Sequence, residues 1–391
     1  MTEPPATGPL QGVRVVELAG IGPGPFAAML LADLGADVIR VERPDGGLRL
    51  SRPEHDLLNR GRRSVALDLK RPEHREAVLS LAQRADVLLE GFRPGVAERL
   101  GVGPEDCAAR NARLVYGRVT GWGRDGPLAH TAGHDVGYVA LAGALHQIGR
   151  AGGPPQVPLN LLGYFAGGAL YLVVGVLAAL HEVERSGRGQ VVDAAIVDGT
   201  AHLMTMIHGL LAGGRWREER GVNLLDTGAP FYDVYETADG RHLAVGALEP
   251  QFWQAFTERL GVTDLPDRDD PDQWPRLRTR LAETLATRTL AEWVDVFADT
   301  DACVAPVLTP SESAAHPHLV ARGTYVEAEG VLQAAPAPRF SRTPATLSTP
   351  PHRSGTDTVE ALRDWGVAVP ADLDAGDTAA DEGGAAAATS G

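Results

Sequence analysis

The side chains best suited to acid–base chemistry are His134, the adjacent Asp135, and Tyr164 further along the chain. An imidazole has an unperturbed pKa of about 6.5, so it can take up or release a proton near neutral pH. A phenol, whose pKa is near 10, acts mainly as a donor under the same conditions. Gly133 and Gly163 precede the His and the Tyr, and such small residues let a ligand or another backbone segment come close. This combination predicts a site for proton transfer on a bound ligand.

Basic side chains gather in the loops of the N-terminal half, where they could hold an anionic ligand. In parallel α/β sheets, ligands bind in the loops at the carboxyl ends of the strands. Guanidinium groups suit phosphate oxygens, so a phosphorylated ligand such as coenzyme A would account for these residues. A solvated surface would account for them equally well. The residues concerned are Arg43, Arg60, Arg62, Arg63, Lys70, Arg93 and Arg99.

The overall composition limits the possible partners. The 391-residue chain has a formal net charge of −15, which argues against nucleic acid or an anionic membrane surface as the main partner. Its cysteines, Cys107 and Cys303, lie far apart, which indicates a reducing compartment and neither a zinc site nor a disulfide framework. The uncharged stretch 151–180 is interrupted by Gly and Pro in its first half, so we expect a buried helix there and no membrane span. Because the N-terminus has no secretory pattern, the sequence predicts a cytoplasmic protein.

The N-terminal half is predicted to be an α/β domain with a mostly parallel sheet. Val13–Leu18 and Val38–Glu42 have the composition of strands, and the helix between them is expected to end at Gly35. Further strands are expected at Ser64–Leu69, Val87–Glu90 and Leu114–Thr120, again with intervening helices. The glycine-rich turn after the first strand suggests a nicotinamide dinucleotide site as an alternative, with Glu42 on the ribose. Its Gly-x-Gly-x-Gly spacing departs from that motif and favours a tight packing turn.

A smaller α+β domain is predicted for residues 228–312, because a hairpin signature at Asp239-Gly240 precedes several amphipathic helices. The large α/β domain is expected to cover residues 12–205. Residues 206–227 would form a linker, and residues 313–350 would return the chain to the large domain. Residues 1–11 are expected to be disordered, as is the end of the C-terminal tail, 351–391, which is acidic and poor in apolar side chains.

Several short motifs occur in a fixed order along the chain. They are Val16-Glu17-Leu18-Ala19-Gly20-Ile21-Gly22-Pro23-Gly24-Pro25, Leu67-Asp68-Leu69-Lys70, Glu90-Gly91-Phe92-Arg93-Pro94-Gly95, Thr120-Gly121-Trp122-Gly123, Ala132-Gly133-His134-Asp135, Gly189-Gln190-Val191-Val192-Asp193 and Ala247-Leu248-Glu249-Pro250-Gln251-Phe252. Together they resemble the α-methylacyl-CoA racemases, in the family III CoA-transferase (CaiB/BaiF) superfamily. The resemblance extends over residues 9 to 345, so it leaves out both tails.

The resemblance implies a homodimer of two interlocked chains, each with a Rossmann-like large domain and a small domain. The small domain of one subunit would close the active site of the other. The substrate would be an acyl-CoA, with no separate cofactor and no metal. Asp135 and Glu249 match acidic residues that the family places around the site. The residues that match its coenzyme A contacts are Arg43, Leu67, Lys70, Arg93, Arg99 and Tyr138.

The chain departs from the family at the second catalytic base. In the family, a histidine and an aspartate on opposite faces of the α-carbon remove and return its proton through an enolate. His134 matches the histidine, whereas Tyr164 stands in the place of the aspartate. A phenol is a poor base at neutral pH, since several pKa units separate it from a carboxylate and each unit is worth ~1.4 kcal/mol.

Three hypotheses follow from that departure. The first is a racemase-like isomerase in which Tyr164 alters the second step. The second is an enzyme repurposed for acid–base chemistry on another carbonyl substrate, such as a natural-product intermediate. The third is an acyl-CoA-binding protein without turnover. A CoA-transferase is disfavoured, because in those enzymes the missing aspartate carries the acyl group.

Overall fold

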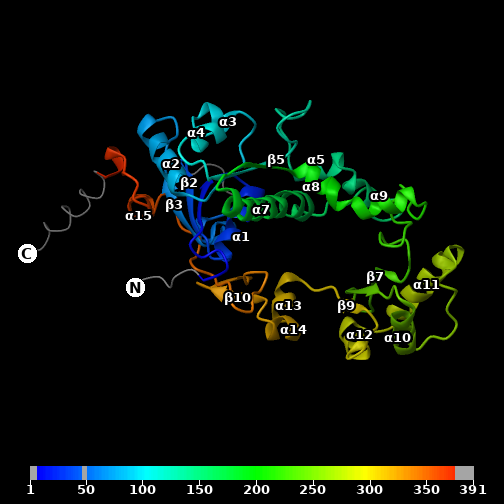
Figure 1. Cartoon of the computed structure of the whole chain (residues 1–391). Coiled ribbons are helices and arrows are strands. Elements are labelled where there is room, and N and C mark those ends of the chain that lie inside the picture. Colours follow the sequence, from blue (N-terminus) through cyan, green and yellow to red (C-terminus); the bar gives the residue numbers. More distant parts are fainter. Residues whose placement is uncertain (1–6, 46–50, 375–391) are drawn as a thin grey trace, which may run out of the picture. The chain divides into compact units, whose positions relative to one another are not determined.

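The computed structural model describes residues 7–45 and 51–374, which divide into two compact units (Figure 1). The first unit contains the described residues up to Tyr138, the segment Asn160–His202, and the described residues from Gly323 onward. The second unit contains Val139–Leu159 and Leu203–Arg322. The second unit is therefore inserted into the chain of the first.

A six-stranded parallel sheet forms the middle of the first unit, with the strand order β3-β2-β1-β4-β5-β6. The order changes direction between β1 and β4, which is the point where Rossmann-like sheets bind ligands. The predicted α/β fold with its parallel sheet is thus confirmed. The strands are β1 (Arg14–Leu18), β2 (Asp37–Glu42), β3 (Arg62–Ala66), β4 (Val87–Glu90), β5 (Val115–Thr120) and β6 (Val191–Ala195).

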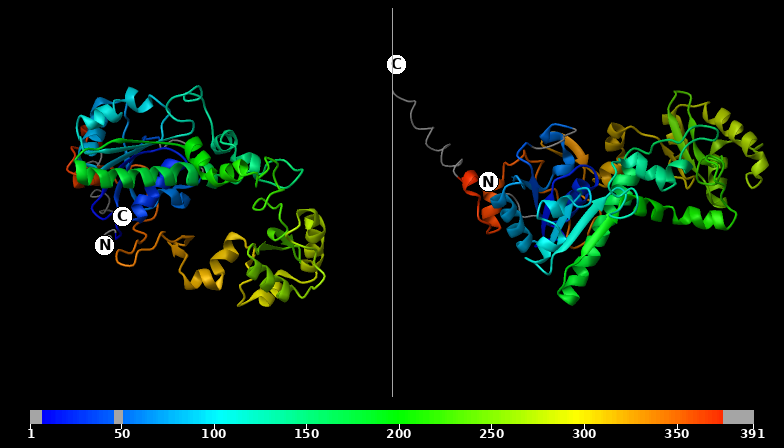
Figure 2. Two further views of the ribbon diagram at one scale, coloured as in Figure 1. Left: turned by 45° about the vertical axis from the view of Figure 1, so that its right-hand side comes forward. Right: turned by 90° about the horizontal axis from the view of Figure 1, so that it is seen from above.

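Helices cover both faces of this sheet, which is why β1, β2, β4 and β5 are buried at consecutive positions. In β1, Val15 packs with Ala27 of α1 and Leu172 of α7, whereas Val16 packs with Ala77 of α2 on the opposite face. Figure 2 shows α7 running along the sheet. The helices of this unit are α1 (Pro23–Asp33), α2 (Pro72–Arg84), α3 (Val96–Arg99), α4 (Pro104–Ala108), a π-helical segment (Leu161–Leu170), α7 (Tyr171–Ser186) and α15 (Thr358–Asp364).

Smaller elements complete the first unit. A hairpin of β10 (Tyr325–Ala328) and β11 (Val331–Ala334) is antiparallel, and short 3-10 turns lie at Pro53–His55 and Leu57–Asn59. Two helices, α5 (Asp135–Leu141) and α8 (Ile196–Leu203), contain residues of both units.

The second unit is an α+β body around the antiparallel sheet β7-β8-β9. The predicted hairpin is confirmed: β7 (Tyr232–Glu236) and β8 (His242–Gly246) pair across a turn in which Gly240 has a φ of 71°. Phe256, Leu281 and Trp293 are buried in the core that the helices form with this sheet. Its remaining elements are α6 (Ala144–Gln147), α9 (Thr205–Ala212), α10 (Pro250–Leu260), a 3-10 turn (Pro271–Gln273), α11 (Trp274–Leu285), α12 (Leu290–Phe297), β9 (Val304–Pro306), α13 (Pro310–Ala315) and α14 (Pro317–Ala321).

Residues 139–159 lie in a different unit from the one that the sequence suggested. We expected them in the large domain, but they group with the second unit. The reason is a set of polar contacts with residues 216–233. Trp216 Nε1 donates a hydrogen bond to Gln147 Oε1 at 3.0 Å, and the guanidinium of Arg150 pairs with the buried carboxylate of Asp233.

The chain ends also depart from the expected boundaries. Residues 351–374, which we expected to be a tail, include α15, and they bury Ala361 and Trp365 in the core of the first unit. Near the other end, the Leu10 amide donates to the Leu34 carbonyl at 2.9 Å. Residues 1–6 and 375–391, for which we predicted disorder, lie outside the described residues.

One helical stretch among the described residues, Leu161–Ser186, is long and apolar enough to cross a membrane by length and composition alone, with a mean hydropathy of 2.0. Within it, α7 buries Leu172, Val173 and Val176 on the sheet. This is the packing of a core helix, as we predicted for this stretch.

Candidate active site

Two adjoining pockets lie beside the carboxyl ends of the first unit's strands. The His–Tyr pocket has a volume of about 240 Å³ and contains His134 and Tyr164 in its lining. The sheet-edge pocket has a volume of about 460 Å³ and contains Arg43 and Lys70. Both pockets are lined by Ile21 from the loop after β1 and by Gly91 and Phe92 from the loop after β4. These loops flank the switch point of the sheet, so the pockets occupy the expected ligand position of this fold.

His134 and Tyr164 are in direct contact in the His–Tyr pocket. The His134 Nδ1 atom lies 3.0 Å from the Tyr164 hydroxyl oxygen. His134 is exposed and immediately precedes α5, whereas Tyr164 is half-buried within the π-helical segment. Segments of π-helix occur frequently at functional sites, where they change the direction of a side chain.

Asp135 connects these two elements. Its Oδ1 atom accepts a hydrogen bond from the Tyr164 amide at 2.5 Å, and the Gly163 amide also donates to this carboxylate. Its second oxygen is buried and has no hydrogen-bond partner among the residues that the structure describes. Burial therefore raises the pKa of Asp135, although the two amide bonds oppose the shift. The carboxylate fixes the start of the π-helical segment, and with it the position of Tyr164.

The phenol of Tyr164 is a donor at neutral pH. Burial raises its pKa above the ordinary value, so it keeps its proton. When His134 is neutral, the hydroxyl donates to Nδ1, and the imidazole proton then resides on Nε2. In that state the two side chains form a neutral hydrogen-bonded pair.

Tyr138 supports Tyr164 from the interior of the unit. Its ring packs edge-on against Trp122, with ring centroids 4.6 Å apart, and its centroid lies 6.3 Å from that of Tyr164. Burial raises the pKa of Tyr138 to about 12. This packing requires a glycine, because a Cβ on Gly121 would lie 2.0 Å from the Tyr138 ring. A Cβ on Gly22, whose φ is 73°, would lie 2.7 Å from the Tyr164 ring.

Several basic residues that we considered for anion binding form ion pairs with acidic residues of the first unit instead. Arg60 pairs with Asp33 at 2.5 Å, Arg62 pairs with Glu17, and Arg63 bonds to Asp37 at 2.8 Å. Arg60 and Arg62 are also buried, so they stabilise the edge of the sheet and are not available to a ligand.

The other predicted binding residues lie at or near the pockets. Leu67 and Lys70 line the sheet-edge pocket from the loop after β3, together with the exposed Arg43. Arg93 lines the His–Tyr pocket, and Arg99 lies on α3 with its guanidinium beside Gly95. Glu249 belongs to the second unit, where it immediately precedes α10.

The sequence did not lead us to some of the residues that line the two pockets. Ile21 and Phe92 belong to both pockets, and Trp122 lines the His–Tyr pocket, but none of them was a candidate. All of them lie beside glycines in loops that follow predicted strands. That position could have identified them, because such loops form the ligand edge of a parallel sheet.

The family of the chain follows from comparison with known proteins. Residues 10–358 match the model of CoA-transferase family III, so the chain belongs to this family. The α-methylacyl-CoA racemase of Mus musculus is 46% identical over 361 residues, covering 91% of this chain and 93% of the relative. The α-methylacyl-CoA racemase of Homo sapiens is 46% identical over 342 residues, covering 87% of this chain and 88% of the relative. The resemblance to the racemases is thereby confirmed.

Solved structures agree with the fold. A CAIB/BAIF family protein from Brucella suis has a TM-score of 0.76 and 27% identity, and the match covers 92% of this chain and all of that one (100%). Rv3272 from M. tuberculosis has a TM-score of 0.74 and 29% identity, covering 90% of this chain and 99% of that one.

Proposed function

We propose that this protein is an α-methylacyl-CoA racemase-like isomerase that moves the proton on the carbon α to a thioester. Its similarity to two α-methylacyl-CoA racemases over most of their length supports the reaction class. The observation that carries the proposal is the His134–Tyr164 pair, at 3.0 Å, in a pocket that adjoins the basic sheet-edge pocket. The coenzyme A part of the substrate would occupy the sheet-edge pocket, beside Lys70 and Arg43. Its thioester would then enter the His–Tyr pocket.

The described pair must separate before inversion can occur. A proton donor or acceptor works within about 3 Å of its target, so groups on opposite sides of a carbon stand roughly 6 Å apart. His134 Nδ1 and the Tyr164 hydroxyl are 3.0 Å apart, which leaves no room for a carbon between them. We therefore infer that substrate binding turns one of the two side chains away from the other.

Each proton in the proposed reaction has a source and a destination. Nδ1 of His134 takes the α-proton, which gives an imidazolium and an enolate. The Tyr164 hydroxyl then gives its proton to the α-carbon from the opposite face and becomes a phenolate. When the two side chains meet again, the imidazolium returns a proton to the phenolate and restores the neutral pair. The raised pKa of Tyr164 favours the return of the proton from the imidazolium to the phenolate. It also makes Tyr164 a poor base for the reverse reaction, because the hydroxyl keeps its proton.

Coenzyme A transfer is disfavoured because Tyr164 offers no carboxylate to carry an acyl group. Two other possibilities are outcomes of the test: acid–base chemistry on a different carbonyl substrate, and acyl-CoA binding without turnover. We also propose that Glu249 belongs to the active site of a homodimer, as it would in the racemases that the sequence resembles.

The test is deuterium incorporation from D₂O into each pure enantiomer of a 2-methylacyl-CoA, followed by NMR and chiral analysis. We expect exchange in the parent protein and none in His134→Ala. The matched control is His181→Ala, which removes an exposed histidine on α7 and should leave exchange unchanged. Exchange with inversion supports the isomerase, whereas a His134→Ala protein that exchanges as fast as the parent contradicts the proposal. Coenzyme A binding without exchange would favour the alternatives.

A further inference from the structure

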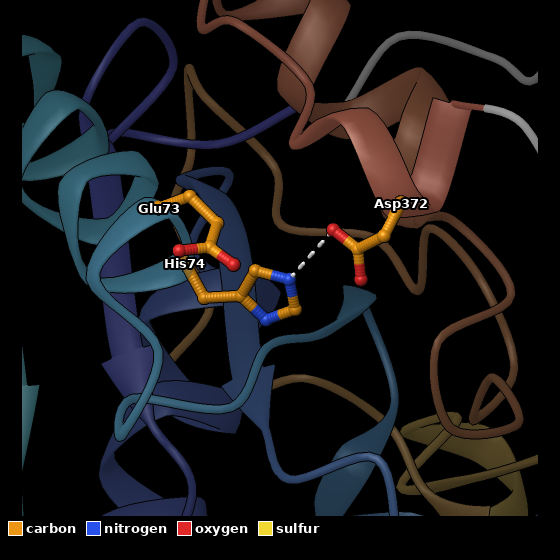
Figure 3. Close-up of side chains that lie close together, drawn as sticks. All are labelled: Glu73, His74 and Asp372. Atoms are coloured by element: carbon orange, nitrogen blue, oxygen red, sulfur yellow. Dashed lines mark hydrogen bonds and ion pairs between the residues drawn. The ribbon is translucent and has the colours of Figure 1, made fainter.

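A buried histidine, His74, connects the C-terminal segment to the loop between β3 and α2. It lies in the first turn of α2 and is 2% exposed. Its Nδ1 atom accepts a hydrogen bond from the Asp68 amide at 2.9 Å. Its Nε2 atom lies 3.2 Å from Oδ1 of Asp372, toward which the ring points in Figure 3. The imidazole therefore bridges two segments that are far apart in the sequence.

The donor and acceptor roles in this bridge are fixed by chemistry. A backbone amide can only donate, so Nδ1 must accept, and the ring proton resides on Nε2 and is donated to Asp372. Glu73, His74 and Asp372 lie close enough together to suggest a metal site. However, both ring nitrogens are occupied, and Arg71 already pairs with Glu73 at 2.6 Å and with Asp372 at 2.5 Å. The cluster is a closed hydrogen-bonded network and not a cation site.

The loop that this network holds lines the sheet-edge pocket. Leu67, Asp68, Leu69 and Lys70 all contribute to the pocket wall. Within the loop, the Asp68 side chain accepts from the Lys70 amide at 3.0 Å, so fixing Asp68 also fixes the backbone that carries Lys70. An ordered loop loses less conformational freedom when it binds a ligand.

We propose that His74 and Asp372 are positioning residues for the coenzyme A part of the substrate, because they fix the β3–α2 loop in its binding conformation. This inference rests on the proposed function, which puts coenzyme A in the sheet-edge pocket. Neither residue lines that pocket. They act on the ligand through Asp68 and Lys70, while the proton-transfer groups remain in the neighbouring pocket.

The variants test separately the two hydrogen bonds of the His74 imidazole, with the Asp68 amide and with Asp372. His74→Leu removes both, whereas His74→Asn keeps an acceptor near the position of Nδ1 and loses the contact with Asp372. Asp372→Ala keeps the first contact and removes the second, together with the ion pair between Asp372 and Arg71. The matched control is Asp374→Ala, because Asp374 lies in the same segment but pairs with Arg363, at 2.6 Å, away from the loop.

Two measurements test the proposal: amide hydrogen exchange across residues 67–70, and calorimetric titration with coenzyme A. In His74→Leu we expect the Asp68 amide to exchange faster and the Kd for coenzyme A to rise about tenfold, with KM raised and kcat little changed. His74→Asn should recover most of the lost protection and affinity. If His74→Leu does not fold, Asp372→Ala carries the same test, since Asp372 lies nearer the surface. The control should match the parent protein in both measurements.

The outcomes distinguish this inference from the proposed function. If the parent protein binds coenzyme A and the folded variants bind it equally well, the positioning role is wrong and the proposed function stands. If loop protection is unchanged while affinity falls, the loop mechanism is wrong. A parent protein that does not bind coenzyme A would overturn both.

Discussion

A phenol at position 164 fills space that a carboxylate there would leave open. The Tyr164 hydroxyl reaches His134 Nδ1, whereas an aspartate side chain is too short to extend that far along the same direction. Replacing the phenol therefore changes the base strength at this position and also opens a gap in front of His134. The two effects act together in the first prediction.

Tyr164→Asp should increase the rate of inversion about tenfold or more, a change of ~1.4 kcal/mol or more in the barrier. A carboxylate is ionised at neutral pH and can remove a proton from the face opposite His134. In the parent protein, exchange should be faster from the enantiomer whose α-proton faces His134. Tyr164→Phe should keep that exchange and slow inversion, while Tyr171→Phe serves as the control. Equal exchange rates from both enantiomers in the parent protein would rule out the asymmetry.

Tyr138 makes the stability of the protein depend on pH in the alkaline range. Burial raises its pKa to about 12, from an ordinary value of 10.0. Below pH 10 both the folded and the unfolded protein keep the phenol proton, so this contribution to stability is fully present. Between about pH 10 and pH 12 the unfolded state loses the proton first, so the free energy of unfolding should fall as the pH rises. Urea unfolding from pH 9 to pH 12 should give a steeper fall in the parent protein than in Tyr138→Phe, and equal slopes would contradict the prediction.

The sequence identified the residue types of the site better than their arrangement. His134 and Tyr164 were predicted as the proton-transfer pair, on opposite faces of a substrate carbon. In the structure they bond to each other, because the π-helical segment and the Asp135 carboxylate determine where the Tyr164 ring points. A π-helical segment has no clear signature in a sequence whose apolar residues are nearly continuous, as they are here. The contact therefore could not be derived from spacing.

At the scale of elements, α15 completes the hydrophobic core of the first unit with residues from late in the sequence. Trp365, which follows this helix, is 3% exposed, and its Nε1 atom donates to Asp37 Oδ2 at 2.7 Å. The guanidinium of Arg14 lies 5.2 Å from the centre of its ring. Trp365 therefore connects the segment that follows α15 to the starts of β1 and β2.

Trp365→Ala should lower the free energy of unfolding by ~3–5 kcal/mol, the usual cost of removing a large buried side chain. Trp365→Phe should cost less, because it keeps most of the buried surface and loses mainly the hydrogen bond to Asp37. Urea unfolding followed by circular dichroism measures both. A Trp365→Ala protein as stable as the parent would show that α15 contributes little to the core.

Elements with strong local signals were predicted well, and elements that depend on distant contacts were not. The strands of the parallel sheet and the β7–β8 hairpin follow from apolar runs and turn residues. The helix α15 is only seven residues long, Thr358–Asp364, and its buried face fits no long apolar period. Its position depends on contact with β3 and α2, which lie far away in the sequence.

At the scale of the whole molecule, an apolar surface where the π-helical segment continues into α7 is relevant to assembly. Leu170, the last residue of the π-helical segment, and Val174 of α7 are 42% and 66% exposed, and their spacing puts them on the same side of the helix. Exposed apolar side chains that are adjacent on a helix are typical of contact surfaces. This observation supports the homodimer that we propose.

Sedimentation velocity at micromolar concentration should therefore show a dimer of the parent protein. Val174→Glu should shift the equilibrium toward the monomer, since burying an unpaired carboxylate in an apolar interface is costly. Circular dichroism would verify that the variant stays folded. A parent protein that sediments as a stable, folded monomer would refute the dimer.

The insertion of one unit into the other determines the order in which the ribosome completes them. The second unit ends at Arg322, whereas the first unit still requires the residues after Gly323. All residues of the second unit are therefore synthesised before α15 and Trp365 emerge. During that interval, the surface beside β3 that α15 later covers remains exposed to solvent in the nascent first unit. A chain that ended after Arg322 and before α15 would contain every residue of the second unit. Part of the first unit's core would then be open to solvent.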